Sequence, residues 1–93
     1  MPIYDIGRIC VKLAGREAGR KCVVVEKLDK NYVIISGPVK ISRVKRRRVN
    51  LKQLEPTNEM IKISKGISDE DLQKALQSEN KIEMMKERIK IKV

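Results

Sequence analysis

The stretch "GRICVKLAGREAGRKCVVV", residues 7–25, decides the fold expected for this chain. Apolar and polar residues alternate over its first seven positions, which predicts a strand with one apolar face. That face carries Ile9, Val11 and Leu13, and the other face carries Arg8 and Lys12. A strand of this kind needs a partner to cover its apolar side, so the stretch points to a sheet.

A turn follows in "GREAG", with Gly15 and Gly19 at its two ends. Glycine adopts positive φ without steric cost, which tight turns often require. A second strand is expected over residues 20–28, which contain the apolar run "CVVV". The two strands and the turn between them predict a hairpin.

A third strand is predicted over residues 32–37, after the short polar turn "DKN" at 29–31. Gly37, followed by Pro38, would end this strand. Beyond it the pattern is less regular. Residues 39–54 fit a strand, a loop and another strand that carries Val49 and Leu51.

Two further elements are expected before the last third of the chain. "LEPTN" (54–58) contains Pro56, which indicates a turn or a single helical turn. "MIKIS" (60–64) alternates again, with Ile61 and Ile63 on one face, and predicts a short strand.

A helix is predicted over residues 67–80. Ser68 suits the N-cap, and Asp71 three positions later forms a variant of the capping box. The apolar stripe of this helix consists of Leu72, Ala75 and Leu76. The last segment, 81–93, ends in strict alternation and fits either a final strand or a helix that frays.

The composition limits how the core is built. The 93 residues include no Phe or Trp and only two Tyr, so Val, Ile and Leu must fill the interior. Branched residues favour strands. Several short strands followed by one helix predict a mainly β fold: a small, strongly curved β-barrel with a C-terminal α-helix and a possible final strand.

The charge is strongly positive and unevenly placed. The formal net charge is +10. Residues 1–65 contain 16 Lys/Arg and 6 Asp/Glu, whereas residues 66–93 contain six of each. A local excess of positive charge is typical of a protein that binds a polyanion such as nucleic acid. The alternative is a generally basic protein without such a partner.

Catalysis, metal binding and membrane insertion are not expected. The chain has no His to act as a base and no Gly-Lys-Ser/Thr phosphate loop. Cys10 and Cys22 are 12 positions apart, with no C-x-x-C, so they lack the ligand set of a zinc site. Both are expected to be buried on neighbouring strands, with a redox or disulfide role as the alternative. No segment resembles a signal peptide or a membrane span, which favours the cytosol.

The candidate nucleic-acid-binding residues form two basic sets. The first, in the turn and the strand after it, consists of Arg16, Arg20 and Lys21. The second consists of Lys40, Arg43, Lys45, Arg46, Arg47, Arg48 and Lys52. Arginine's planar fork suits phosphate oxygens. With so few aromatic residues, stacking on single strands is a poor mechanism, and phosphate and shape contacts to folded RNA are favoured.

Each set has a simpler explanation, a solvated basic face or, for the arginine run, a basic tail. A tail is disfavoured because "VNLKQLEP" follows at once and offers Val49, Leu51 and Leu54 as anchors. The basic run "VKRRRVN" at 44–50 is therefore expected to be held by the fold, with Val44 and Val49 at its ends.

These residues carry a family resemblance. "GRICVKLAGREAGRKCVVV" resembles the KOW motif of ribosomal proteins and transcription elongation factors, with Gly19 as its essential glycine. "GREAGRKCVVVEKLDKNYVIISGP" and "VKRRRVNLKQLEPT" are similar to archaeal members of the "L-fourteen-e" family of large-subunit ribosomal proteins. The likeness runs from about Asp5 to Thr57, and "KGISDEDLQKAL" resembles the family's C-terminal helix. Gln53 departs from the family pattern, which would have His there.

The resemblance implies an SH3-like barrel over residues 1–58 and a strand and helix extension over 59–93, packed on the barrel as one domain. It implies a cytoplasmic, structural protein of the large ribosomal subunit. The expected partners are large-subunit ribosomal RNA, bridged through basic loops, and neighbouring ribosomal proteins. No cofactor and no metal are implied, and the free protein is expected to be a monomer. Gly15, Gly19 and Gly37 are the expected structural glycines.

Two other functions remain open. A regulatory factor with a KOW domain would bind a transcription or translation complex through protein contacts, and it need not be so basic. A small basic chromatin protein with an SH3-like barrel would instead bind duplex DNA.

Overall fold

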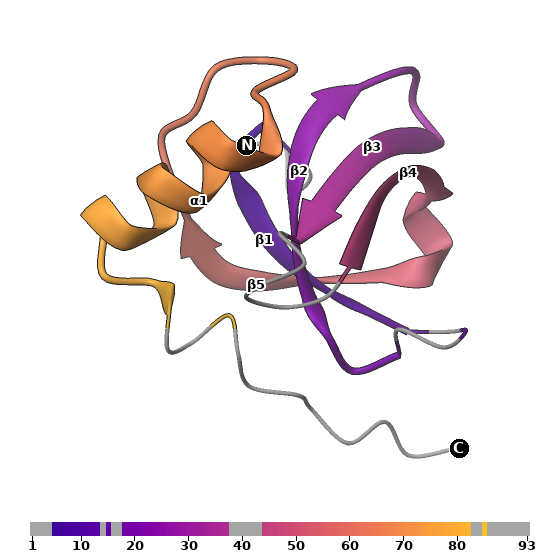
Figure 1. Cartoon of the computed structure of the whole chain (residues 1–93). Helices are drawn as coiled ribbons and strands as arrows, with labels where there is room; N and C mark the ends of the chain where they lie inside the picture. Colours follow the sequence, from indigo (N-terminus) through magenta and orange to yellow (C-terminus); the bar gives the residue numbers. More distant parts are fainter. Residues whose placement is uncertain (1–4, 14, 16–17, 38–43, 83–84, 86–93) are drawn as a thin grey trace.

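The computed structural model describes residues 5–13, 15, 18–37, 44–82 and 85 (Figure 1). The elements in chain order are β1 (Arg8–Lys12), β2 (Lys21–Lys27), β3 (Tyr32–Gly37), β4 (Val44–Asn50), the 3-10 turn η1 (Leu51–Gln53), β5 (Leu54–Met60) and α1 (Asp69–Ser78). All pairings are antiparallel, and the strand order is β4-β3-β2-β1-β5. The mainly β fold with a C-terminal helix is confirmed. Between the described residues of β4 and β5 no pairing closes the sheet.

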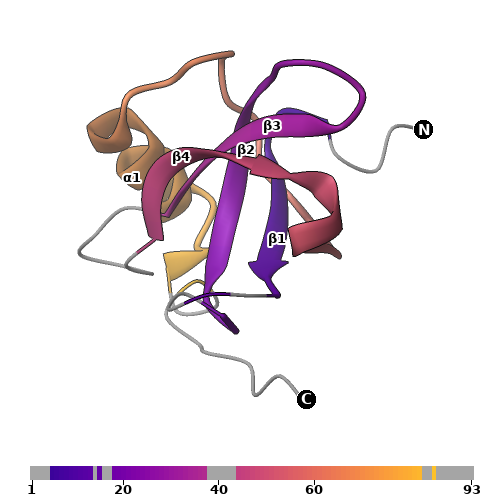
Figure 2. The same cartoon turned by 90° about the vertical axis from the view of Figure 1, so that its right-hand side faces the viewer.

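The sheet is bent, and it is buried on both faces. Figures 1 and 2 show α1 against one side of the sheet, while the strands curve around the other. The inner cluster consists of Cys10, Cys22, Val24, Val33, Ile35, Val44, Val49 and Leu54. The helix-side cluster consists of Ile9, Val23, Val25, Ile61, Leu72, Leu76 and Met85. The core is therefore built without aromatic rings, mostly from branched aliphatic side chains, as the composition predicts.

The predicted β1–β2 hairpin is confirmed. Cys10 lies opposite Cys22 in the register, and the two are not joined by a disulfide. Gly15 and Gly19 have φ of +81° and +85°, and the Gly19 N–H donates to the Lys12 carbonyl at 2.8 Å. The alternation predicted one apolar face and one polar face for β1, but the structure buries both faces of the strand. Cys10 belongs to the inner cluster, and Lys12 beyond it is only 6% exposed.

A β-bulge allows β4 to anchor both of its ends. Val44 and Val49 are five positions apart, so a regular strand would point them to opposite faces. Between the Ile35 and Gly37 pairings, however, β4 uses one residue more than β3. Both valines therefore face the inner cluster. The four basic residues between them belong to a strand, so the prediction that they sit in a loop was wrong.

The predicted turn at 54–58 was also wrong. Residues 54–60 form β5, and the helical turn comes earlier, in η1. Proline lacks an N–H, but β5 ends the strand order and pairs with β1 alone in the described sheet, so Pro56 fits this edge position. The strand predicted at 60–64 does not continue beyond Met60. Ile61 is nevertheless buried, and Ile63 packs against the helix-side cluster.

Gly7 ties this segment to the rest of the sheet. Its N–H donates to the Val24 carbonyl at 2.8 Å, and its carbonyl accepts from the Ile61 N–H at 2.9 Å. Gly7 has φ of +97°, and a Cβ at this position would lie 2.0 Å from the Ile61 oxygen. The close backbone approach between the chain before β1 and the chain after β5 therefore requires glycine.

The predicted helix is confirmed with slightly narrower bounds. The Ser68 hydroxyl accepts from the Asp71 N–H at 3.2 Å, as the capping pattern indicates. Leu72 and Leu76 are fully buried, and Ala75 packs against the same helix-side cluster. The possible final strand at residues 89–93 lies outside the part of the chain that the structure describes.

Candidate nucleic-acid interface

The exposed basic residues of β4 form the main part of the candidate interface. Lys45, Arg46, Arg47 and Arg48 are all exposed, although they lie in one strand. In the described sheet β4 has a single partner, β3, and stands at the end of the strand order. The strand thus presents its cations at a sheet edge, where large ligands have access.

Arg46 is bound within the protein, at the start of α1. Its Nε and Nη2 atoms donate to Oδ1 of Asp69 at 3.2 and 3.0 Å. Its Nη2 also donates to the carbonyl of Ile67. The same Asp69 oxygen accepts from the Ser36 hydroxyl at 2.6 Å. The Arg46 fork therefore fastens β4 to the first turn of α1, which leaves fewer of its donors for phosphate.

Arg48 points to a different neighbour. The central carbon of its guanidinium lies 5.0 Å from the centre of the Tyr32 ring, a cation–π distance. Arg48 is opposite Ile34 in the register, and Tyr32 lies two residues before Ile34. Diagonal neighbours of this kind share one face of an antiparallel pair and are within reach of long side chains.

The short turn η1 brings other basic positions close to Arg48. The Leu51 N–H donates to the Asn31 carbonyl at 2.9 Å, which links η1 to the turn between β2 and β3. Its other end is linked to the end of β1, because the Leu13 N–H donates to the Gln53 carbonyl at 2.8 Å. In Figure 1 this turn lies at the right, after β4. Lys52, on η1, is exposed.

Lys27 and Lys30 join this region but were not among the predicted site residues. Both are exposed: Lys27 ends β2, and Lys30 lies in the turn between β2 and β3, which η1 contacts. In the sequence they are single lysines beside acidic residues, so no cluster marks them. The pairing of Tyr32 with Asn50 and the bond between Asn31 and Leu51 bring the turn near the end of β4.

The other predicted residues lie in less open positions or outside the description. Arg20 is half-buried, and Lys21 is 5% exposed, so Lys21 presents little surface to a ligand. Arg16, Lys40 and Arg43 lie outside the described residues. Gly37, predicted to end the third strand, is the last residue of β3, lies opposite Val44 and does not have positive φ.

Asp29 and Asn50 organise the backbone at this corner. Oδ1 of Asp29 accepts from the N–H groups of Asn31 and Tyr32 at 2.7 and 3.0 Å, which confirms the predicted polar turn. Oδ1 of Asn50 accepts from the Lys52 N–H at 2.9 Å and caps η1. These bonds fix the turns from which the exposed lysines project.

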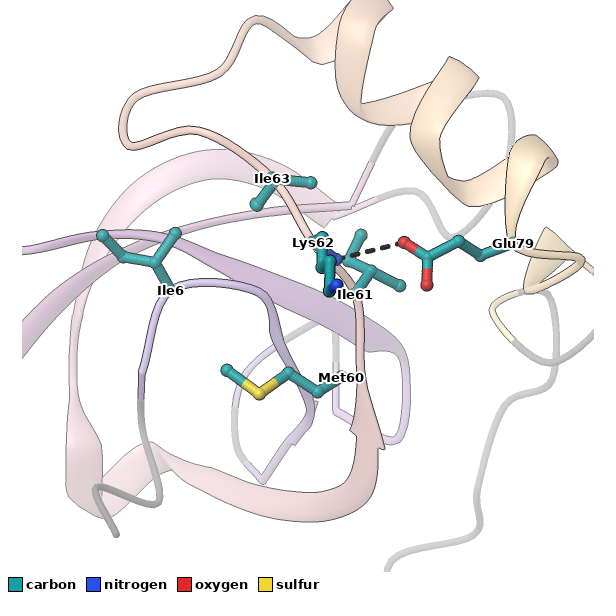
Figure 3. A pocket seen from close by; sticks show the side chains of 6 residues that line it. All are labelled: Ile6, Met60, Ile61, Lys62, Ile63 and Glu79. Carbon is teal, nitrogen blue, oxygen red and sulfur yellow. Dashed lines mark hydrogen bonds between the residues drawn. The ribbon is translucent and has the colours of Figure 1, made fainter.

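An apolar pocket of about 430 Å³ lies at the far end of β5, away from η1 (Figure 3). It is lined by Ile6, Met60, Ile61, Lys62, Ile63 and Glu79. The Lys62 N–H donates to Glu79 Oε2 at 3.1 Å across its edge. With one lysine and one glutamate at its rim, this pocket lacks the cation cluster that phosphates require.

The described residues also bear on metal binding, thiol reactivity and membrane insertion. They contain no group of three or more His, Cys, Asp or Glu that could hold a metal. Burial raises the pKa of the Cys10 thiol to about 12, so the thiol is protonated at neutral pH and is a poor nucleophile. No helix in the described part of the chain is long and apolar enough to span a membrane.

Comparison with known proteins gives close relatives over the whole chain. It is 50% identical to large ribosomal subunit protein eL14 of Metallosphaera sedula, 56% identical to that of Saccharolobus islandicus, and 55% identical to that of Saccharolobus solfataricus. Each likeness covers all 93 residues of this chain and 97% of the relative. No family model matches the chain.

Proposed function

Since this chain belongs to the family of large ribosomal subunit protein eL14, we propose that it is a structural component of the large subunit of cytoplasmic ribosomes and binds ribosomal RNA. The observation that carries the RNA contact is the exposed basic run of β4, held between two buried valines. Adjacent cations repel one another, and an anionic partner lowers that repulsion. RNA phosphates are such a partner.

The register supports a role in bridging two RNA segments. Arg47 is opposite Ile35 of the inner cluster, whereas Arg48 is opposite Ile34, which packs against the helix-side cluster. Adjacent side chains of a strand point to opposite faces. At a sheet edge, Arg47 and Arg48 can therefore reach phosphates on two sides of the strand, and their positive charges reduce the repulsion between those phosphates.

The interface extends over the corner around η1. Its central members are Arg47, Arg48, Lys52, Lys27 and Lys30, with Arg20 at the β1–β2 hairpin. Arg46 and Lys21 have smaller parts, because one is bonded to α1 and the other is buried. Arg16, Lys40 and Arg43, which are basic and close in sequence to these residues, retain their predicted roles.

We further propose that the curved sheet is an open SH3-like barrel. Residues 1–58 form the barrel, and 59–93 form an extension that packs on it as one domain. Support comes from the helix-side cluster, in which Leu72 and Leu76 of α1 share a core with Ile9 and Val23 of the sheet. Neighbouring ribosomal proteins are the other proposed partners, and the free protein is a monomer.

The RNA contact is tested by changing Arg47 and Arg48 to Gln together, which removes two charges and keeps hydrogen-bonding side chains. If each arginine neutralises one phosphate, the slope of log affinity against log salt flattens by about 0.7–0.9 per residue, or roughly 1.4–1.8 in all. Changing Lys65 and Lys74 to Gln is the matched control, because both are exposed but lie near α1. Parallel slopes for wild type and the arginine variant would contradict the proposal.

Sedimentation separates this function from its rivals. A structural component remains with the large subunit in high salt, whereas a loosely held regulatory factor is released. Competition between duplex DNA and structured RNA of equal length tests the chromatin alternative. A clear preference for the duplex DNA would overturn a ribosomal role.

A further inference from the structure

We propose that Tyr32 and Arg48 form a stacking platform for an unpaired base of the bound RNA. The inference rests on the proposed function and makes it more specific, because it assigns base recognition to a surface otherwise expected to contact phosphates. The scarcity of aromatic residues argued against stacking. The structure, however, places one of the chain's two tyrosines beside the arginine run.

The geometry of the pair suits a flat ligand. The Arg48 guanidinium lies over the Tyr32 ring at 5.0 Å from its centre. Tyr32 is half-buried, and Arg48 is exposed. Unpaired RNA bases stack on guanidinium planes as well as on aromatic rings. A base stacked on the outer side of Arg48 would form a third layer on a support that is already assembled.

The backbone of both members is held in place before any ligand arrives. The Tyr32 N–H donates to Asp29 Oδ1 at 3.0 Å, and the Tyr32 carbonyl accepts from Leu28 and Asp29 N–H groups at 3.1 and 3.3 Å. The Arg48 backbone is fixed by the β3–β4 ladder and by Val49 in the inner cluster. Stacking on this pair therefore requires no ordering of the backbone, and its entropy cost is confined to the side chains.

The surroundings suit a nucleotide rather than a neutral ring. The Leu51–Asn31 bond places Lys52 and Lys30, both exposed, on the two segments that flank the pair. A nucleotide whose base stacks on Arg48 has a phosphate on each side, and two lysines offer charges for them. Two acids lie in this region: Asp29, whose Oδ1 is already bonded to two backbone N–H groups, and Glu26, which is opposite Ile34 in the register.

The test compares two RNA hairpins of equal length, one fully paired and one with a single unpaired base, made with each of the four bases in turn. Wild-type protein should bind the bulged hairpins about 5- to 100-fold more tightly, the range expected for stacking one base. An abasic site at the bulge, which keeps the phosphate, should abolish this preference.

The decisive variant is Arg48→Lys, which keeps the charge and removes the planar group. It should lose the preference for the bulge while its salt slope stays that of wild type. Arg47→Lys is the matched control, because it makes the same change at the adjacent position, whose side chain points to the other face of the strand. It should retain the preference. Tyr32→Phe should also retain it, and Tyr32→Leu should reduce it.

If Tyr32→Leu does not fold, Arg48→Lys decides the question alone. Equal affinity of wild type for paired and bulged hairpins, or equal behaviour of Arg48→Lys and Arg47→Lys, would overturn the platform; the pair would then suit a protein partner. These results would leave the proposed function intact if the Arg47 and Arg48 double Gln variant still flattened the salt slope. A failed salt test would overturn the proposed function instead.

Discussion

The two ends of the arginine run in β4, Arg46 and Arg48, carry the same side chain and use it differently. At the first end, Arg46 is bonded to Asp69 and to the carbonyl of Ile67, so its charge is paired within the protein. At the second end, Arg48 lies on Tyr32 and faces solvent. A run of like charges is therefore not one functional unit. Arg46 stabilises the contact between β4 and α1, whereas Arg48 remains accessible to a ligand.

Gly7→Ala should have the largest effect on stability, because it disturbs the backbone contact that ties the segment after β5, beside the helix-side cluster, to the rest of the sheet. The new Cβ would lie 2.0 Å from the Ile61 carbonyl oxygen, at a φ of +97°. Backbone strain and the clash together should lower the free energy of unfolding by about 2–5 kcal/mol. Thermal and denaturant melts measure the loss. Gly66→Ala is the control, since it also has positive φ but open space around the added Cβ, so it should cost less.

Leu72→Ala and Leu76→Ala should weaken the packing of α1, to which Arg46 is bonded, and should leave the surroundings of Arg48 unchanged. Both side chains are fully buried under the sheet, and truncation of such a leucine costs about 2–5 kcal/mol. Lys74→Ala on the exposed side of α1 is the control and should change stability little. At temperatures where the variants remain folded, their RNA affinity and salt slope should equal those of wild type. A large affinity loss with stability intact would show that α1 takes part in binding.

Arg46→Gln should cost stability more than binding. The ion pair with Asp69 is about a third to a half exposed, so its loss should lower unfolding free energy by about 0.5–1 kcal/mol. Asp69→Asn and the double variant complete a mutant cycle that isolates the coupling. The salt slope should flatten less for Arg46→Gln than for Arg48→Gln. Equal flattening by the two variants would mean that Arg46 leaves Asp69 when RNA binds.

The smallest expected effect is on the reactivity of Cys10, which reports opening of the inner cluster. Burial raises its pKa from 9.0 to about 12, so below pH 9 almost none of Cys10 is thiolate in the folded protein. Labelling by a thiol reagent at pH 8 should therefore proceed through transient opening. Arg46→Gln should speed it about 2- to 5-fold, in line with its stability loss, and Arg48→Gln should not. The stability of the folded protein should fall as the pH rises from 9 to 12, because the Cys10 thiol ionises at lower pH in the unfolded chain than in the folded one. Cys10→Ala should lessen that fall.

The local elements of the fold were predictable where one physical preference dominated. Alternation located β1, the polar turn at 29–31 located the start of β3, the glycine pair located the turn between β1 and β2, and Ser68 marked the start of α1. Burial at both ends of the basic run was also foreseen, because Val44 and Val49 could not both remain in water without cost.

The errors arose where distant parts of the chain decide the outcome. Pro56 indicates a turn by itself, but an edge position next to β1 accommodates it. The burial of Lys21 in the curved hairpin was not indicated by its neighbours in the sequence, and its contact with nucleic acid stays a prediction. Arg46 could not be separated from its neighbours, because Asp69 is 23 positions away in the chain.

The bulge in β4 also determines how the length of the basic run can vary. The run holds four residues between two inward valines, and the bulge absorbs the one that regular alternation cannot place. Deleting one basic residue would put the valines four positions apart, a spacing at which both face inward in a regular strand. The fold can therefore lose one charge from this edge without exposing its core. Adding a residue would put the valines six positions apart, where both can again face inward, but β4 would then have two residues more than β3 over this stretch and would need a larger bulge. The shorter run should therefore be tolerated better than the longer one.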